Sequence, residues 1–200
     1  MAVVTLSRQL GSLGFETAQL VAQRTGFRLV WRELINQAAR RAGAPEVALA
    51  VIDELNLLGL KPSPEDMQAY LNAVRTVMEE LANEGDVIIV GRAGQIILAN
   101  HPRTLHVRVT APVSVRVERL AQRQGISLKA ARAQVDASDR YHQSYFKRYY
   151  KLPWDGPGLY DLVINTAKLN MEDAAEIICI ALGKCAARSA PPVSSAGDAL

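Results

Sequence analysis

Short apolar runs alternate with longer amphipathic segments along most of this chain. Most of the apolar runs are rich in β-branched residues and bounded by turn-forming residues, which is typical of strands covered on both faces. The runs predict five strands, at residues 2–6, 27–31, 86–91, 104–109 and 160–165.

The segments between these strands carry apolar residues every three or four positions, which is the spacing of one buried helix face. One such segment follows the glycine-bearing turn after the first strand, around Ala18 and Val21. Others are predicted at residues 33–41, 46–58, 64–85, 93–99, 112–124, 127–150 and 172–185. Strands that alternate with helices need crossover connections, so the pattern predicts a mostly parallel five-stranded sheet with helices on both faces, a three-layer α/β/α fold.

Composition places these elements in one domain. The chain has 200 residues, of which 49% are hydrophobic and 22% charged, and this suffices for one core. We expect the domain to span residues 1–186, and the segment 187–200, which has little to bury, to be a disordered tail. The opening residues carry no leader pattern, and no run reaches the roughly 18 apolar residues of a spanning helix, so we expect a cytoplasmic protein without a membrane partner.

The charge distribution narrows the class of ligand. The net charge of +3 comes from basic residues that are scattered along the sequence rather than gathered in one block. A nucleic-acid partner is not expected, because such proteins more often concentrate positive charge on one face or carry a recognisable reading motif. A mild positive charge is compatible with a small phosphorylated ligand.

The turn after the first strand, within residues 7–16, has the glycines of a phosphate-binding loop. Glycines between a strand and a helix let backbone N–H groups and the positive helix end face an anion, although an ordinary turn can contain the same Gly-x-x-Gly. The residues that would hold donor phosphates are Gly11, Ser12, Leu13, Gly14, Phe15 and Glu16. A complete loop ends in Gly-Lys-Ser/Thr, whereas Phe15 and Glu16 occupy the last two positions here.

Four segments, taken in order, resemble the cytidylate kinase-like proteins, relatives of bacterial cytidylate kinase among the P-loop kinases. They are residues 7–14, 32–35, 90–94 and 160–166, which together span most of residues 1–186. The resemblance implies a P-loop NTPase fold with a helical acceptor-binding segment at about 32–84 and a helical lid at about 127–152. It also implies ATP as the phosphoryl donor and Mg²⁺ as a cofactor.

The loop of this family is similar to Ser-Arg-x-x-Gly-Ser-Gly-Gly, so the missing lysine is a family trait. This chain departs further, because Leu13 stands where the family has a glycine. Arg8 is our candidate for the replacement cation, although an arginine at a strand end pairs with a carboxylate at least as often. Glu16 would help beside a polyphosphate only if it held a metal ion.

Arg92 follows the buried run at 86–91 and should project into the crevice at the carboxyl end of the sheet. In cytidylate kinase the similar Gly-Arg-Asp places the arginine on the acceptor phosphate and the aspartate on the acceptor nucleoside. Arg92 fits the first role, and Ala93 cannot perform the second, so the resemblance implies a phosphorylated acceptor without indicating cytidine monophosphate. A surface salt bridge is the alternative for Arg92.

Arg32 and Glu33 lie where the acceptor-binding segment of the family begins, just past the second predicted strand. The resemblance makes them candidate acceptor ligands. An ion pair on a helix surface explains the same two residues equally well.

The long polar helix at 127–150 carries the lid pattern of these kinases in Asp136, Asp139 and Arg140. A closing lid brings arginines onto the transferred phosphoryl group, which makes Arg140 the first catalytic candidate and Arg148 the second. A solvated helix face is the alternative. The tyrosines of this segment, if exposed, would suit a homodimer contact. Three histidines, at 101, 106 and 142, are too dispersed to predict a metal site.

We therefore predict ATP-dependent, Mg²⁺-requiring phosphoryl transfer to a nucleotide or another small phosphorylated molecule. The alternative is a nucleotide-binding or sensory module that has kept the fold and lost catalysis, which Phe15, Glu16 and Ala93 favour. A dinucleotide-binding oxidoreductase has little support, because the first turn lacks the Gly-x-Gly-x-x-Gly spacing.

Overall fold

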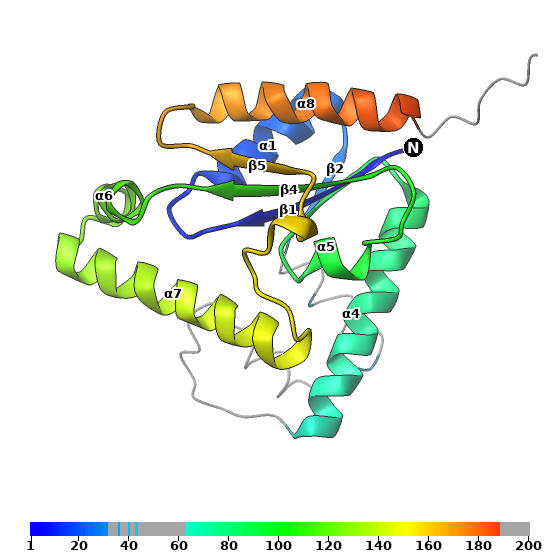
Figure 1. The fold of residues 1–200 in the computed structure, drawn as a ribbon, viewed down its shortest axis with the longest axis horizontal. Coiled ribbons are helices and arrows are strands. Elements are labelled where there is room, and N and C mark those ends of the chain that lie inside the picture. The colour runs from blue at the N-terminus through cyan, green and yellow to red at the C-terminus, as the bar shows by residue number, and fades with distance from the viewer. Residues whose placement is uncertain (32–35, 37–39, 41–42, 44–62, 189–200) are drawn as a thin grey trace, which may run out of the picture.

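The computed structural model describes residues 1–31, 36, 40, 43 and 63–188. It contains a five-stranded sheet in which neighbouring strands are parallel, in the order β2-β3-β1-β4-β5 (Figure 1). The strands are β1 (Val3–Arg8), β2 (Arg28–Val30), β3 (Val87–Val90), β4 (Thr104–Thr110) and β5 (Leu162–Asn165). The five predicted strands and their parallel arrangement are confirmed.

Helices cover both faces of the sheet, as the three-layer prediction requires. On one face lie α1 (Gly14–Thr25) and α8 (Met171–Arg188), and on the other lie α4 (Pro64–Glu84), α5 (Gly94–Ile97) and α7 (Leu128–Tyr149) (Figure 1). The remaining elements are α6 (Val113–Gln124), which follows β4, and η1 (Pro157–Leu159), a short 3-10 turn before β5. The predicted helices at 33–41 and 46–58 fall almost entirely outside the described residues. Of the predicted tail at 187–200, residues 187 and 188 belong to α8, and residues 189–200 lie outside the described residues.

Serine caps determine where the two long helices begin. Ser63 precedes α4 and Ser127 precedes α7, and each hydroxyl accepts a hydrogen bond from a backbone N–H of the first turn, at 3.0 and 3.2 Å. Such a bond satisfies a donor for which the helix has no partner and stabilises the helix by about 1 kcal/mol. Pro64 adds the fixed φ that the first helical position favours.

The core has one apolar layer on each face of the sheet. Successive residues of β1 point to opposite faces, so Val4 and Leu6 pack toward α1 and α8 while Val3 packs toward α4. β3 is buried along its whole length, because it lies between β2 and β1 and is covered on both sides. Burial on both faces explains the uninterrupted apolar run that predicted this strand.

The face of the sheet toward α5 and α7 is polar at its centre. By strand alternation Ser7 of β1 and Arg108 of β4 lie on this face with Thr5 and His106, and all four residues are buried. The Thr5 hydroxyl is 2.7 Å from Nδ1 of His106, whose backbone N–H donates to the Asp161 carboxylate at 2.7 Å. Thr5 and His106 thus satisfy each other within the core.

A buried arginine joins α6 to its neighbours. The Arg116 side chain is 1% exposed, its two Nη atoms lie 3.1 and 2.7 Å from the Asp139 carboxylate oxygens, and its Nε donates to the Ala111 carbonyl at 2.9 Å. One Nη also reaches the Leu10 carbonyl at 3.4 Å. The two parallel bonds match the planar guanidinium to the carboxylate. Asp139 of α7 is therefore held against α6.

We predict that Asp139→Ala lowers the free energy of unfolding by about 3 kcal/mol or more, because it leaves the Arg116 charge buried without its carboxylate. The matched change Asp136→Ala breaks an exposed pair with Arg132 on the same helix and should cost about 0.5 kcal/mol or less. Urea unfolding of both variants measures the difference. Equal losses would show that the buried pair contributes no more than a surface pair.

A second prediction concerns pH. Burial lowers the pKa of His106 below its ordinary value of 6.5, and the Asp161 charge offsets only part of this effect. The unfolded chain then binds the extra proton first, so this contribution to stability is complete above about pH 6.5 and is lost as the pH falls toward the lower folded pKa. We expect His106→Gln to flatten the dependence of unfolding free energy on pH between pH 7 and 5. An unchanged slope would contradict this assignment.

Candidate functional site

The loop between β1 and α1 turns sharply on two residues with left-handed backbone. Gly11 has φ 82° and Leu13 has φ 61°, and Leu13 is the N-cap residue of α1. Leu13 makes no side-chain capping bond, so that side chain does not occupy the first N–H groups of the helix. Backbone N–H groups at a helix start, together with the positive helix end, suit an anion.

Close packing explains why two of the loop positions are glycine. A Cβ atom at Gly11 would lie 2.6 Å from the Arg116 carbonyl oxygen, and one at Gly14 would lie 2.4 Å from Cβ of Arg8. Real Cβ atoms do not approach other heavy atoms this closely. Gly11 is therefore required by its neighbour on α6 as well as by its positive φ.

Residues at the ends of neighbouring strands hold the loop in place. The Thr166 hydroxyl, just after β5, donates to the Ser12 carbonyl at 2.8 Å, and the Ser12 hydroxyl donates to the Gln9 carbonyl at 2.8 Å. Arg119 of α6 in turn donates to the Thr166 carbonyl at 2.7 Å. These bonds give the loop a fixed shape before any ligand binds, which is the condition for electrostatic preorganisation.

A pocket opens over this loop, and we call it the loop pocket. At one side of it Arg123 of α6 and Glu16 of α1 form an ion pair at 3.0 Å. Both side chains are partly exposed, so the pair contributes little to stability and can reorganise around a ligand. The loop pocket is lined by Arg8, Gln9, Leu10, Gly11, Leu13, Gly14, Phe15, Glu16, Arg123 and His142.

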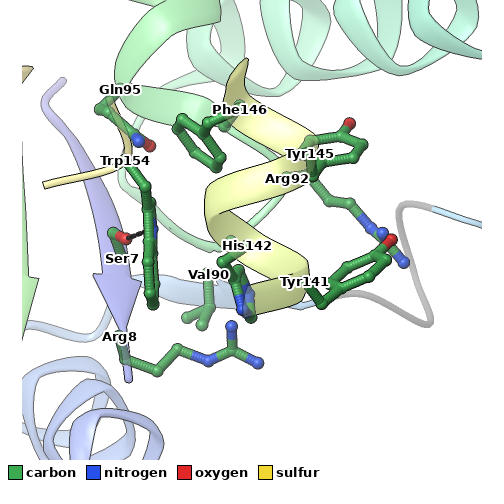
Figure 2. Close-up of a pocket in the computed structure, with 12 residues that line it drawn as sticks. Ser7, Arg8, Val90, Arg92, Gln95, Tyr141, His142, Tyr145, Phe146 and Trp154 are labelled. Carbon is green, nitrogen blue, oxygen red and sulfur yellow. Dashed lines mark hydrogen bonds between the residues drawn. The ribbon is translucent and has the colours of Figure 1, made fainter. Parts of the chain in front are cut away.

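A second pocket, the aromatic pocket, lies beside it between the ends of β1 and β3 and the C-terminal half of α7 (Figure 2). Figure 2 shows Tyr141, His142, Tyr145 and Phe146 on α7 with Arg8 and Arg92 at the rim. The aromatic pocket is lined by Ser7, Arg8, Val90, Gly91, Arg92, Ala93, Gln95, Tyr141, His142, Tyr145, Phe146 and Trp154. Arg8 and His142 line both pockets, so the two spaces meet at these side chains.

Arg92 influences several buried tyrosines. Burial raises the pKa of Tyr145 well above its usual range, and it raises the pKa of Tyr70 and of Tyr150 in the same direction. The positive charge of Arg92 opposes the rise for all three, although burial prevails. The three phenols therefore stay neutral at ordinary pH beside the positive charge of Arg92. That charge can act on an anionic ligand in the aromatic pocket.

A hydrogen-bonded network supports the wall of the aromatic pocket. The indole N–H of Trp154 donates to the Ser7 hydroxyl at 3.1 Å, and the Tyr160 hydroxyl donates to the Trp154 carbonyl at 2.7 Å. Arg108 lies over the Trp154 ring, 4.2 Å from its centroid, and donates to the same carbonyl at 3.2 Å. A cation–π contact of a buried arginine contributes about 2 kcal/mol when desolvated. Trp154 is consequently fixed to the strand that leads into the loop.

The model of the cytidylate kinase-like family matches residues 3–168 of this chain. This chain belongs to that family. A cytidylate kinase of Ignicoccus hospitalis is 30% identical over 178 residues, which cover 89% of this chain and 97% of that enzyme. The family match at residues 3–168 includes the five strands, the loop and the residues that line both pockets of this cytidylate kinase-like protein.

Solved structures support the fold of this cytidylate kinase-like protein. An uncharacterized protein from Eubacterium ventriosum superposes with a TM-score of 0.74 at 19% identity, covering 92% of this chain and 99% of that one. A shikimate kinase from Acinetobacter baumannii superposes with a TM-score of 0.53 at 12% identity, covering 92% and 94% of the two chains. At these identities the likeness shows a shared fold and nothing about activity or substrate.

Only some of the predicted site residues come together in this family member. Arg8 and Arg92 line the aromatic pocket, and all of the predicted loop residues except Ser12 line the loop pocket. Ser12 is fully buried beneath the loop, where its hydroxyl and carbonyl are hydrogen-bonded. Arg32 and Glu33 lie outside the described residues, so their predicted role in acceptor binding stays a prediction.

The two predicted lid arginines lie away from the junction of the pockets. Arg140 is exposed on α7, and Arg148 lies over the Tyr149 ring at 5.5 Å beside a groove that also contains Lys147 and Lys151. A catalytic role for either arginine would require α7 to move, as the lid prediction assumes. That role stays a prediction.

Half of the aromatic residues of this segment are core. Tyr145 is 9% exposed, and Phe146 and Trp154 are 3% exposed, whereas Tyr141, Tyr149 and Tyr150 are half-buried. The homodimer prediction keeps only a partly exposed aromatic surface, and it stays untested. No helix in the described part of the chain is long and apolar enough to cross a membrane.

Sequence reasoning missed three residues of this site. Arg108 and Arg116 are buried cations, and nothing in a strand or a helix pattern separates them from surface arginines. His142 received no chemistry because the sequence offers no partner near it. His142 lies one turn after Ser138 on the side of α7 that faces the pocket. The sequence does not show which side of the helix that is, because it depends on how α7 packs against the sheet.

We predict that Gly11→Ala weakens nucleotide binding at least tenfold and destabilises the fold by about 2 kcal/mol, because the added Cβ meets the Arg116 carbonyl. Gly125→Ala is the matched control. Gly125 also has positive φ, at 65°, but a Cβ atom there meets nothing within 4 Å. Binding titrations and urea unfolding of both variants separate the clash from the backbone strain. Equal behaviour of the two would contradict the close approach at Gly11.

Proposed function

We propose that this protein transfers the terminal phosphoryl group of ATP to a small phosphorylated acceptor, in the manner of a nucleoside monophosphate kinase. One observation carries the proposal. The loop pocket and the aromatic pocket meet at Arg8, so a phosphate donor in the first and an acceptor in the second would bring their phosphates to the same arginine.

The side chains at each pocket indicate which phosphate each residue would bind. The loop backbone at residues 11–16 would hold the donor phosphates, and Arg92 would hold the acceptor phosphate with its planar fork. Arg8, between them, would stabilise the charge that develops on the transferred group. No covalent intermediate is required, because phosphoryl transfer depends on positioning and charge.

The fit of the implied Mg²⁺ depends on the nucleotide. The described residues contain no cluster of three or more His, Cys, Asp or Glu side chains that could hold a metal ion. Magnesium at kinase sites is typically held by substrate phosphates with one or two carboxylates, so a prebuilt cage is not required. Glu16 is the carboxylate that lines the loop pocket, and it would hold the ion after leaving Arg123. Bound magnesium would neutralise charge on the donor phosphates.

The fixed shape of the loop favours catalysis over a module that only binds nucleotide. The loop has its anchoring hydrogen bonds and its two close glycine contacts, even though Phe15 stands where a complete phosphate loop has lysine. Arg8 places a positive charge at the junction, since it lines both pockets. Charge at this junction contributes to the transition state, where a donor-binding lysine would otherwise act.

The assay is acceptor-dependent consumption of ATP with Mg²⁺, tested against a panel of nucleoside monophosphates. We expect turnover with at least one acceptor, and we expect Arg92→Ala to lower kcat/KM by about 100-fold or more, since it removes a bidentate phosphate contact. The control is Arg132→Ala, an exposed arginine on α7 that should leave kcat/KM within about twofold.

Two results would overturn the proposal. Saturable binding of ATP without turnover on any acceptor would instead indicate a binding module. Turnover that Arg92→Ala leaves unchanged would place the acceptor phosphate elsewhere.

A further inference from the structure

His142 is the residue of α7 that reaches the junction of the two pockets. It lines the loop pocket and the aromatic pocket, and Arg8 of β1 does the same from the opposite wall. Figure 2 shows the His142 ring and the Arg8 side chain at the same end of the aromatic pocket. A phosphate that passes between the pockets must therefore pass these two side chains.

Hydrogen bonding defines which nitrogen of the ring faces the ligand. Nδ1 of His142 is 2.8 Å from the Ser138 carbonyl oxygen, one turn earlier on α7. A carbonyl oxygen can only accept, so Nδ1 carries the hydrogen and Nε2 is the nitrogen that gains a proton. In the protonated ring Nε2–H becomes a second, charged donor that can bond a phosphate oxygen.

Packing fixes the orientation of the ring. The Trp154 indole stacks on His142 with ring centroids 4.4 Å apart and planes 15° apart, and Tyr141 packs edge-on at 5.7 Å. Trp154 is itself held by Ser7 and Arg108. An imidazole restrained in this way loses little rotamer freedom when it binds a ligand.

We propose that protonated His142 binds the phosphate at the junction and, with Arg8, supplies the positive charge that the lysine of a complete phosphate loop would supply. A role of His142 in catalysis rests on the proposed function. The contact itself requires only that a phosphate occupies the junction. His142 would then be a phosphate-binding residue contributed by the helix that the family resemblance assigns to the lid.

The charges around His142 make its proton sensitive to the ligand. The charged and titratable groups that share its pockets come from β1, the turn after β3, α6, α1 and α7 itself; they are Arg8, Arg92, Arg123, Glu16, Tyr141 and Tyr145. Three of them are cations, and Glu16 is already paired with Arg123. A phosphate bound beside the ring would favour its protonated form, because an anion stabilises a nearby positive charge. Binding should therefore be coupled to proton uptake.

The chain offers a direct optical probe of this proton. Its two tryptophans are Trp31 and Trp154, and Trp154 stacks on the His142 ring. In a Trp31→Phe background the emission of Trp154 should fall as the stacked imidazole becomes protonated. The full-length protein is titrated from pH 8 to 5 with no ligand, with saturating ATP and Mg²⁺, with cytidine monophosphate, and with adenosine, which lacks phosphate.

We expect bound ATP or cytidine monophosphate to raise the midpoint of the emission change by about one pH unit, as a nearby anion does for a histidine. Adenosine should not move it. His142→Gln in the same background should abolish the emission change, while His101→Gln, at a histidine that bonds Thr104 instead, should leave it intact. An unchanged midpoint with either phosphate ligand bound, or no saturable binding of both, would overturn the proposal.

A kinetic measurement separates this proposal from the proposed function. If the protein turns over, His142→Gln should lower kcat about tenfold at pH 6 and much less at pH 8, because the proposed contact requires the protonated ring. A loss that is equal at both pH values would indicate a structural role and overturn the assignment. If the protein shows no turnover on any acceptor, the kinase proposal fails, yet the fluorescence titration still decides whether His142 contacts phosphate.

Discussion

The buried guanidinium of Arg116 is the contact on which the rest of the site depends. It bonds the Leu10 carbonyl of the phosphate loop, the Ala111 carbonyl after β4 and the Asp139 carboxylate of α7. Its own backbone lies so close to Gly11 that no side chain fits there. One side chain thus fixes the shape of the loop and the position of the helix that carries His142. Because the charge is desolvated, losing any one partner costs far more than losing a surface bond.

The phosphate loop has a strained backbone at Leu13, and the surrounding hydrogen bonds hold it in that conformation. Leu13 adopts a left-handed backbone where the family has a glycine, which costs a non-glycine residue about 1 kcal/mol or more. The anchoring bonds from Thr166 and Arg119 offset that cost. Strain that persists at such a turn is typical of a ligand-binding site whose geometry is set before binding.

The sequence predicted the strands well and the buried charges poorly, for one physical reason. An apolar run such as 86–91 can be satisfied only by burial, so its environment follows from composition. Arg108 and Arg116 read as surface residues, because their burial depends on carbonyls, a carboxylate and an indole that distant segments contribute. The tyrosines of α7 were ambiguous in the same way, and the fold buries Tyr145 while it leaves Tyr141 and Tyr149 half-buried. The positions of Arg8 and Arg92 at the pocket could be predicted, because both lie at or just past the carboxyl ends of strands, which share one edge of the sheet.

Acceptor recognition also follows from the composition of the aromatic pocket. Ala93, which is 3% exposed, stands where the resembling kinases place the aspartate that binds the acceptor nucleoside, and the surrounding wall consists largely of aromatic rings. Aromatic faces bind any planar base by stacking, whereas a carboxylate bonds only bases with donors in the right place. A site built to hydrogen-bond its substrate rejects analogues far more strongly than an apolar one. Under the proposed function, Arg92 would therefore contribute most of the discrimination in the described part of this site, and it would select for phosphate rather than for one base.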